Sequence, residues 1–193
     1  MPKVGMEPIR RDALVKATIL EIGRAGSLDV TVSQIAKRAG MSSALAHHYF
    51  GNKDKMFLAA MRHILGQYGA HVRAALAGAR TPRQRVEAVI RAGFDDLNFS
   101  PEVISAWLNF YVQAQNAPDV ARLLRIYQHR LRSNLRAGLR PLAGPGADAL
   151  AEGLAAMIDG LYIRQSLREA PPDGAAATAM VLDYLDAKLE ARA

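Results

Sequence analysis

The residues best suited to binding a partner lie in one short run, Thr31 to Phe50, where two predicted helices meet at a glycine. Gly40 can adopt the left-handed backbone conformation that ends a helix, and Ser42 can cap the next helix by accepting from a first-turn amide. Ala36 is small enough for the two helices to cross closely. The inward side is apolar and holds Ile35, Met41, Ala46 and Phe50. Such a junction can place its second helix in the major groove of DNA, although an ordinary helical hairpin has the same spacing.

The outward side of the second predicted helix is polar but uncharged. From Gly40 to Asn52 the sequence holds no Lys, Arg, Asp or Glu. Cations flank the stretch at Lys37, Arg38, Lys53 and Lys55, and they suit phosphate contacts, which position a protein on DNA without reading its sequence. The side chains left to face bases are Ser42, Ser43, His47, His48 and Tyr49. None is the arginine that most often reads guanine, so we expect modest direct readout. DNA shape adds to it, as does a basic arm with Lys3, Arg10 and Arg11.

This run resembles the DNA-binding motif of the TetR family of transcriptional repressors. The family pattern is matched at Thr31, Val32, Ile35, Ala36, Ala39, Gly40, Ser42, Tyr49, Phe50 and Lys53. Four positions depart from it: Met41 stands for Val, Ala44 for Gly, Ala46 for Leu and His47 for Tyr. The resemblance implies a repressor that binds double-stranded operator DNA through Arg10, Arg11, Thr31, Ser33, Ser42, Ser43, Ala44, His47, His48, Tyr49 and Lys53.

The resemblance also implies an all-α, TetR-like fold in two parts. Residues 1–53 would form a three-helix DNA-binding domain with the helix-turn-helix, and residues 54–193 a ligand-binding and dimerisation domain. Apolar residues recur at helical spacing in almost every segment, and no segment shows sustained alternation of period two, so we expect about nine helices and no strands. Cap-and-proline pairs predict two helix starts, at Thr81-Pro82 and Ser100-Pro101.

A second group of candidate binding residues is aromatic. Five of the twelve aromatic residues lie between Phe94 and Tyr111, beside Asp95 and Asp96. Any single ring is best explained as core. A cluster of rings with a nearby carboxylate is also what a quaternary ammonium requires, because its diffuse charge donates no hydrogen bonds and must be held by ring faces and an anion. The candidate ligand-binding residues are Phe94, Asp95, Trp107, Phe110, Tyr111 and Tyr162. The pair Asp159-Gly160 is a weaker candidate, because it can serve helix packing instead.

Further stretches are similar to one branch of the TetR family, the BetI-type repressors of glycine betaine synthesis from choline. They are Met1 to Met6 followed by Ile9-Arg10-Arg11, Gly93-Phe94-Asp95, Ala106 to Phe110 and Ile158 to Arg164. The resemblance implies repression of genes for choline uptake and choline oxidation, with choline as the inducer. The alternative is a TetR-like repressor that responds to another cationic or amphipathic small molecule.

Composition narrows the remaining function classes. The absence of cysteine removes disulfides, thiolate nucleophiles and thiolate metal ligands. The adjacent His47 and His48 point about 100° apart on a helix, and no further ligand motif accompanies them, so we expect neither a metal nor another cofactor. The sequence contains no nucleophile elbow, no metalloprotease motif and no phosphate-binding glycine loop, so we do not expect an enzyme. A basic helical adaptor without sequence preference remains a third class.

Charge and hydropathy are distributed unevenly along the chain. The net charge is +7; residues 1–140 are basic, whereas residues 141–193 hold four Lys or Arg against eight Asp or Glu. The basic part suits DNA and the acidic part suits a partner surface.

We expect a homodimer through the last two helices, by way of small and apolar residues such as Leu150, Leu154, Ile158, Val181 and Leu185. Without a long apolar run or an apolar N-terminal stretch, we expect a cytoplasmic protein that has no membrane contact.

Overall fold

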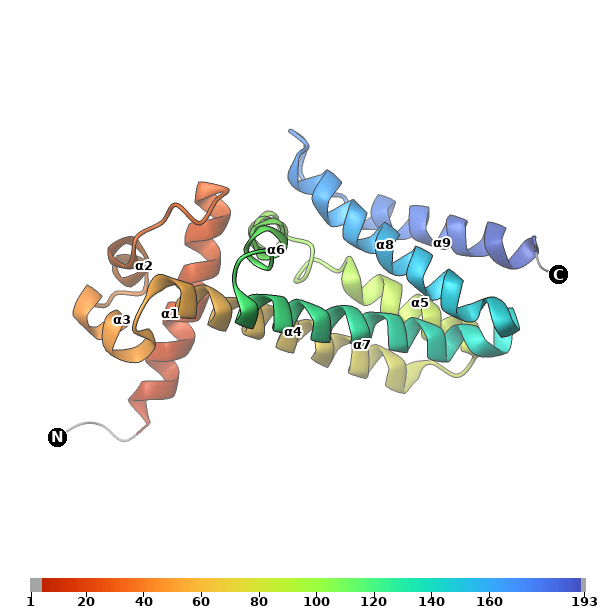
Figure 1. Cartoon of the computed structure of the whole chain (residues 1–193), viewed down its shortest axis with the longest axis horizontal. Helices are drawn as coiled ribbons and strands as arrows, with labels where there is room; N and C mark the ends of the chain where they lie inside the picture. The colour runs from red at the N-terminus through yellow and green to blue at the C-terminus, as the bar shows by residue number, and fades with distance from the viewer. Residues whose placement is uncertain (1–4, 192–193) are drawn as a thin grey trace.

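The computed structural model describes residues 5–191, which form nine α-helices and one short 3₁₀ turn without any strand (Figure 1). The predicted all-α fold is therefore confirmed, while Lys3 of the expected basic arm lies outside the described residues. The helices are α1 (Met6–Ala25), α2 (Val32–Arg38), α3 (Ser43–Phe50), α4 (Lys53–Gly78), α5 (Pro82–Gly93), α6 (Pro101–Gln113), α7 (Pro118–Ala143), α8 (Ala147–Ser166) and α9 (Gly174–Glu190).

Side-chain caps fix where several of these helices begin. Thr31 accepts a hydrogen bond from the backbone amide of Gln34, whose side chain accepts from the amide of Thr31, and the pair Thr81 and Gln84 repeats this arrangement. Ser100 caps α6, which has Pro101 in its first turn. Each such cap contributes about 1 kcal/mol because it satisfies amides that the helix itself leaves unpaired. Both predicted cap-and-proline starts are therefore correct.

The helices divide into a small bundle and a larger body (Figure 1). Helices α1, α2 and α3 pack together at one end of the molecule, and α4 leads from them along the body. In the body, α7 packs against α4, α5 and α8, and α9 lies against α5 and α8. Helix α6 packs against both α1 and α8, so it connects the small bundle to the body.

The contact between α1 and α6 depends on a glycine. A Cβ atom at Gly23 would lie 2.6 Å from the Cα and Cβ atoms of Glu102, so no larger residue fits without moving one helix. The Ser105 hydroxyl donates to the carbonyl oxygen of Ile22 at 3.4 Å in the same contact. Helix α6 thus lies directly against the small bundle through α1.

We expect Gly23→Ala to destabilise the protein by about 1–3 kcal/mol, the usual result of forcing extra volume into a packed contact. Urea unfolding of the purified variant measures the change. Gly66→Ala is a matched control on α4, because a Cβ there meets nothing within 4 Å, and its better helix propensity adds up to about 1 kcal/mol of stability. Equal stability of the two variants would contradict this account of the α1–α6 contact.

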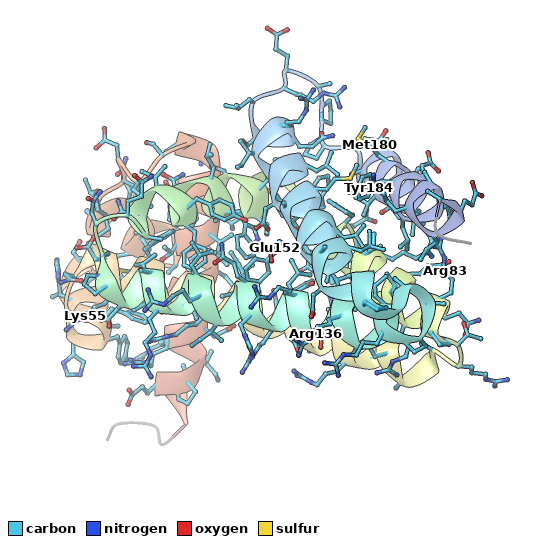
Figure 2. The ribbon with its side chains drawn as sticks, turned by 45° about the vertical axis from the view of Figure 1, so that its right-hand side comes forward. Lys55, Arg83, Arg136, Glu152, Met180 and Tyr184 are labelled. Carbon is cyan, nitrogen blue, oxygen red and sulfur yellow. The ribbon has the colours of Figure 1, made fainter. Side chains whose placement is uncertain are left out.

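The last two helices bury much of their apolar surface inside the protomer, which corrects the expected residues of the dimer face. Leu150, Leu154, Ile158, Val181 and Leu185 are at most 3% exposed because they pack against the rest of the body. They are not available to a second copy. The large apolar side chains that α8, its C-cap and α9 leave exposed are Ile163, Leu167 and Met180, and Tyr184 is half-buried; Met180 and Tyr184 are labelled in Figure 2.

Candidate DNA-binding surface and ligand site

The turn between α2 and α3 has the geometry that its sequence predicts. Gly40 adopts a left-handed φ of 67°, and the Ser42 hydroxyl oxygen accepts from the amide of Leu45 at 3.2 Å. Ile35, Ala36 and Ala46 are fully buried between the helices. The two helices are therefore held in a fixed relation by a buried apolar contact and a capped turn.

The predicted DNA-binding residues are distributed over the open side of this bundle. Most of them are exposed, namely Arg10, Thr31, Ser33, Ser42, Ala44, His47 and His48, while Arg11, Ser43, Tyr49 and Lys53 are half-buried. The Nδ1 atom of His47 lies 2.8 Å from the carbonyl oxygen of Gly51. Because that nitrogen donates to the carbonyl, Nε2 is the ring nitrogen left for an outside partner.

Two of the predicted cations also hold the bundle together. Arg11 donates to the carbonyl oxygen of Tyr49 at 2.8 Å, and its guanidinium lies 4.8 Å from the centre of the Phe50 ring. Lys53 donates to the carbonyl oxygen of Leu28 at 2.8 Å. A guanidinium has five N–H donors and an ammonium three, so both side chains retain donors for a phosphate.

A cluster of rings, which we call the aromatic box, lies in the body and consists of Tyr68, Trp107, Tyr111, Tyr127 and Tyr162. The centre of the Trp107 ring lies 4.5 Å from that of Tyr127 and 5.8 Å from those of Tyr111 and Tyr162, and the Tyr68 ring lies 6.0 Å from that of Tyr127. Four different helices, α4, α6, α7 and α8, supply these rings.

A carboxylate adjoins the aromatic box. The Tyr127 hydroxyl donates to Asp159 at 3.0 Å, and Tyr111 is a second hydrogen-bond donor to the same group. Burial raises the pKa of Asp159, and the two tyrosine hydrogen bonds offset part of that rise. Burial, followed by the negative charge of Asp159, also raises the pKa values of Tyr68, Tyr111 and Tyr127. These tyrosines therefore remain neutral phenols, and of the three it is Tyr111 and Tyr127 that donate to the carboxylate.

The space inside the aromatic box is small in this structure. A cavity of about 10 Å³ is lined by Tyr68, Trp107, Tyr127 and Tyr162 together with Gly93, Asn98 and Ile158. That volume accommodates about one water molecule. A trimethylammonium group can enter only if the rings move apart, so a ligand bound at this place favours a wider arrangement of the rings and of the helices that carry them.

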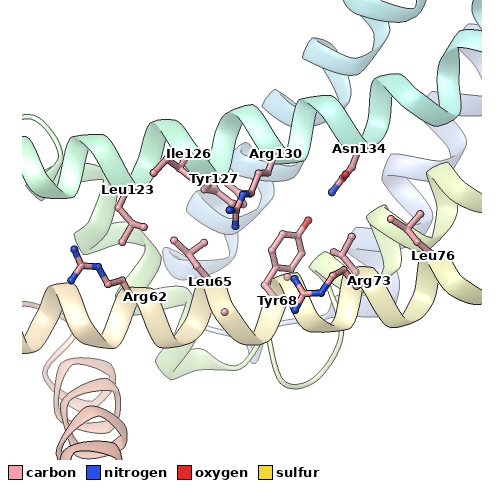
Figure 3. A pocket seen from close by; sticks show the side chains of 13 residues that line it. Arg62, Leu65, Tyr68, Arg73, Leu76, Leu123, Ile126, Tyr127, Arg130 and Asn134 are labelled. Atoms are coloured by element: carbon pink, nitrogen blue, oxygen red, sulfur yellow. The ribbon is translucent and has the colours of Figure 1, made fainter.

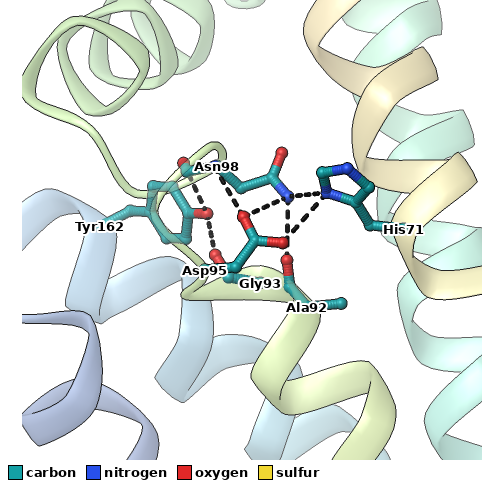
Figure 4. Close-up of polar contacts among 6 residues, drawn as sticks. All are labelled: His71, Ala92, Gly93, Asp95, Asn98 and Tyr162. Atoms are coloured by element: carbon teal, nitrogen blue, oxygen red, sulfur yellow. Dashed lines mark hydrogen bonds and ion pairs between the residues drawn. The ribbon is translucent and has the colours of Figure 1, made fainter. Parts of the chain in front are cut away.

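The predicted carboxylate Asp95 lies in a network beside the aromatic box (Figure 4). Its Oδ1 atom accepts from the backbone amide and the side-chain amide of Asn98, both at 2.9 Å, and its Oδ2 atom lies 3.0 Å from Nδ1 of His71. The Tyr162 hydroxyl donates to the carbonyl oxygens of Gly93 and Asn98. Asp95 therefore organises the loop between α5 and α6, and Asp159 is the carboxylate that contacts the rings.

The remaining predicted ligand residues form a second layer behind the aromatic box. The Phe94 ring lies 6.0 Å from Tyr162 and 5.0 Å from Phe99. Phe110 is fully buried, with its ring 5.5 Å from Trp107. Of the six predicted residues, the structure brings Trp107, Tyr111 and Tyr162 into the aromatic box and places Phe94, Phe110 and Asp95 around it.

Sequence reasoning did not assign Tyr68 and Tyr127 to this site, and it ranked Asp159 as a weaker candidate than the six residues it named. The two tyrosines lie far from the aromatic cluster in the sequence, on helices whose apolar spacing accounts for them as core. Asp159 did carry a signal, since it is a lone acid between Met157-Ile158 and Leu161 in an otherwise apolar helical pattern. A charge in such a place is a candidate for a functional role.

Residues 5–191 contain neither a membrane-spanning helix nor a cluster of metal-ligating side chains. Within that range, no helix is long and apolar enough to span a bilayer. Among the same residues, no three His, Asp or Glu side chains gather in a group that could hold a metal ion.

Comparison with known proteins places the chain in a family. Residues 14–60 match the family model for bacterial regulatory proteins of the tetR family, and residues 82–190 match the model for the C-terminal part of BetI-type transcriptional repressors. An HTH-type transcriptional regulator BetI from Brucella melitensis biotype 2 is 54% identical over 190 residues, covering 98% of this chain and 96% of that protein. A BetI regulator from Rhizobium meliloti (strain 1021) is also 54% identical, covering 99% and 95%.

Solved structures share the fold at lower sequence identity. A TetR transcription regulator from Haloarcula marismortui has a TM-score of 0.83 at 20% identity, covering 93% of this chain and 98% of that one. A protein from Saccharomonospora viridis, solved in complex with choline, has a TM-score of 0.78 at 22% identity, covering 91% and 95%. Both family models and both sequence relatives describe regulators of transcription and not enzymes. The chain is therefore a transcriptional repressor that belongs to the TetR family and to its BetI-type branch.

Proposed function

We propose that this repressor controls genes for choline uptake and for oxidation of choline to glycine betaine, and that choline is its inducer. The observation that carries the proposal is the aromatic box with the Asp159 carboxylate at its edge. Ring faces and one anion form the set of groups that holds a quaternary ammonium. The name of the BetI relatives and the choline in the S. viridis structure support the same ligand.

A cation that approaches the aromatic box meets less positive charge between α7 and α8 than between α4 and α7. A groove of about 480 Å³ between α7 and α8 is lined by Asp159 and Glu152 and also by Arg125 and Arg132, so its acidic and basic side chains balance. The groove on the other side of Tyr127, between α4 and α7, is lined by three arginines and by no acidic residue. A cation is repelled by the second groove, whereas the first groove carries no net formal charge and has Asp159 in its wall.

We also propose a homodimer that binds operator DNA in the cytoplasm. Residues 1–53 would form the DNA-binding domain, and residues 54–193 the ligand-binding and dimerisation domain. The outer surface of α8 and α9, with Ile163, Leu167 and Met180 at 38–73% exposure, is the surface that a second copy would cover. The DNA contacts would come from the exposed residues of α2 and α3 and from Arg10, with Arg11 and Lys53 at the edge.

Thermal unfolding of the full-length protein with choline, glycine betaine and an uncharged isostere of choline tests the inducer. At about 100 times its dissociation constant, choline should stabilise the protein by roughly 2.7 kcal/mol. The isostere lacks the charge that the rings and Asp159 recognise, so it should give a much smaller shift. If choline gives no shift and another cation does, the alternative ligand class replaces choline in this proposal.

Asp159→Asn should raise the melting temperature near neutral pH and weaken choline binding by about 10-fold or more. A carboxyl whose pKa is higher in the folded state contributes stability that is present below its unfolded pKa and lost as pH rises through the folded pKa. At neutral pH the ionised Asp159 therefore opposes folding, and a bound cation relieves this cost. The asparagine keeps an oxygen for the Tyr127 hydroxyl but carries no charge.

The gain in stability from Asp159→Asn should shrink as the pH falls toward the ordinary carboxyl range, since the wild-type group then takes up its proton. Glu152→Gln is the control, because Glu152 lines the same groove but is exposed and paired with Arg132. Calorimetry with choline and melting curves across pH measure both effects. Equal loss of choline affinity in the two variants would show that Asp159 has no special role.

A further inference from the structure

The groove between α4 and α7 combines an apolar lining with unusual positive charge (Figure 3). It measures about 460 Å³, and its apolar side chains are Leu65, Val72, Leu76, Leu123 and Ile126. Arg62, Arg73 and Arg130 line it as well, and no acidic residue does. Among the residues that the structure describes, none of these three guanidiniums has a carboxylate within 4 Å.

Two glycines keep the groove open. Gly66 and Gly69 lie one turn apart in the middle of the 26-residue helix α4 and both line the groove. Glycine inside a helix is less favourable than alanine, and nothing packs closely against Gly66, because a Cβ there would meet no atom within 4 Å. The missing side chain therefore serves no helix crossing in the protomer; its effect is to leave space between α4 and α7.

The groove does not suit the cationic inducer. Three arginines repel a quaternary ammonium, and the only rings exposed to the groove are those of Tyr68 and Tyr127, which form the wall that it shares with the aromatic box. The arginines attract an anion instead, and a guanidinium binds a carboxylate through two parallel hydrogen bonds. From Arg62 to Leu76 the groove follows α4 for about 20 Å, which leaves room for an alkyl chain beside the charged end.

We propose that the groove between α4 and α7 is a second ligand site, which binds a medium-chain fatty acid as its carboxylate. The carboxylate lies between Arg73 and Arg130: the Arg130 guanidinium reaches from α7 into the space between the two helices, and the Arg73 guanidinium lies along α4 over Gly69 (Figure 3). The alkyl chain lies over Gly66 and against the apolar side chains of both helices. This site is distinct from the aromatic box and does not depend on the identity of the inducer.

Isothermal titration of the full-length protein with decanoate, below the concentration at which it forms micelles, tests the proposal. We expect saturable binding of one decanoate per protomer, and at least 10-fold weaker binding of decanol, which lacks the charge. The double variant Arg73→Gln, Arg130→Gln should weaken decanoate binding at least 10-fold. Arg140 is an exposed arginine on α7, the helix of Arg130, but lies outside the groove. The control variant Arg140→Gln should therefore leave decanoate binding unchanged.

Gly66→Leu gives a test in which a folding defect cannot imitate the result. The leucine side chain enters the groove, so decanoate binding should be lost while the melting temperature rises through better helix propensity. Gly66→Ala should gain stability in the same way and keep most of the binding.

The proposal is overturned if decanoate gives no saturable binding, if decanol binds equally well, or if Gly66→Leu binds decanoate like the wild type. It is also overturned if Trp107→Ala removes the binding and the double arginine variant does not, because the acid then occupies the aromatic box. A choline titration of the same samples reports separately on the inducer.

Discussion

Replacing Trp107 with alanine should weaken choline binding by about 100-fold and leave operator binding at its wild-type strength. The Trp107 ring is the centre of the aromatic box, with three tyrosine rings within 6 Å. A desolvated cation over an indole contributes about 2 kcal/mol or more, and removing the ring also loosens the other walls. Each 1.4 kcal/mol corresponds to a factor of ten. Calorimetry with choline and fluorescence anisotropy with labelled promoter DNA measure the two affinities.

A second variant separates ligand recognition from stability. Trp107 is 4% exposed, and its truncation to alanine costs about 3–5 kcal/mol. Trp107→Phe keeps a ring in the core with a weaker cation–ring attraction, so it should lose about 10-fold in choline affinity and little in stability. If either variant binds choline like the wild type, the aromatic box is not the inducer site. A parallel loss of operator binding in a folded protein would contradict the separation of the two sites.

Raising the salt concentration from 50 to 200 mM should weaken operator binding by about 10³-fold or more. The exposed side chains of α3 are Ala44, His47 and His48, so few side chains on this helix can form strong hydrogen bonds to base edges. Phosphate contacts must therefore supply much of the affinity for operator DNA. A protein that neutralises six to ten phosphates loses roughly 10³ to 10⁵ in affinity over this salt range. A plot of log affinity against log salt measures the number of contacts.

Lys55→Gln should make this plot less steep by about two units for a dimer, one for each copy of the lysine. Lys55 is exposed in the first turn of α4, beside the end of α3. Lys188→Gln is the control, since Lys188 lies on α9 over the Tyr184 ring and far from α3 along the molecule (Figure 1). A plot that is nearly flat for the wild type would contradict phosphate anchoring, and equal slopes for the two variants would contradict the placement of Lys55 on the DNA.

The parts of the structure that could be predicted from the sequence depend on local rules. The turn at Gly40, the cap at Ser42 and the proline starts of α5 and α6 follow from the chemistry of a few neighbouring residues, and the structure contains each of them. The rings from Phe94 to Tyr111 were identifiable because they are close in sequence. The spacing of residues in the sequence was sufficient to predict a feature wherever the contacts that determine it lie within one or two helical turns.

The parts that could not be predicted depend on which helices pack together. Tyr68, Tyr127 and Asp159 come from three different helices and meet only because α7 packs against both α4 and α8. The expected dimer face contained residues that the protomer itself buries, such as Leu154 and Val181, since an apolar helix face does not show whether its partner is the same chain or a second copy. Gly66 gave no local signal either, because glycine in a helix can mark a crossing or an open space.

The most direct test of the account is one anisotropy titration of the full-length protein onto DNA from upstream of its own gene, with and without choline, against scrambled DNA of the same length. A BetI-type repressor with this reading surface and this aromatic box should bind its own sequence at least 10³-fold more tightly than the scrambled one in dilute salt. Choline should then release it, since a ligand that widens the aromatic box favours a different helix arrangement. Equal affinity for both DNAs, or complexes that choline leaves intact, would contradict the account.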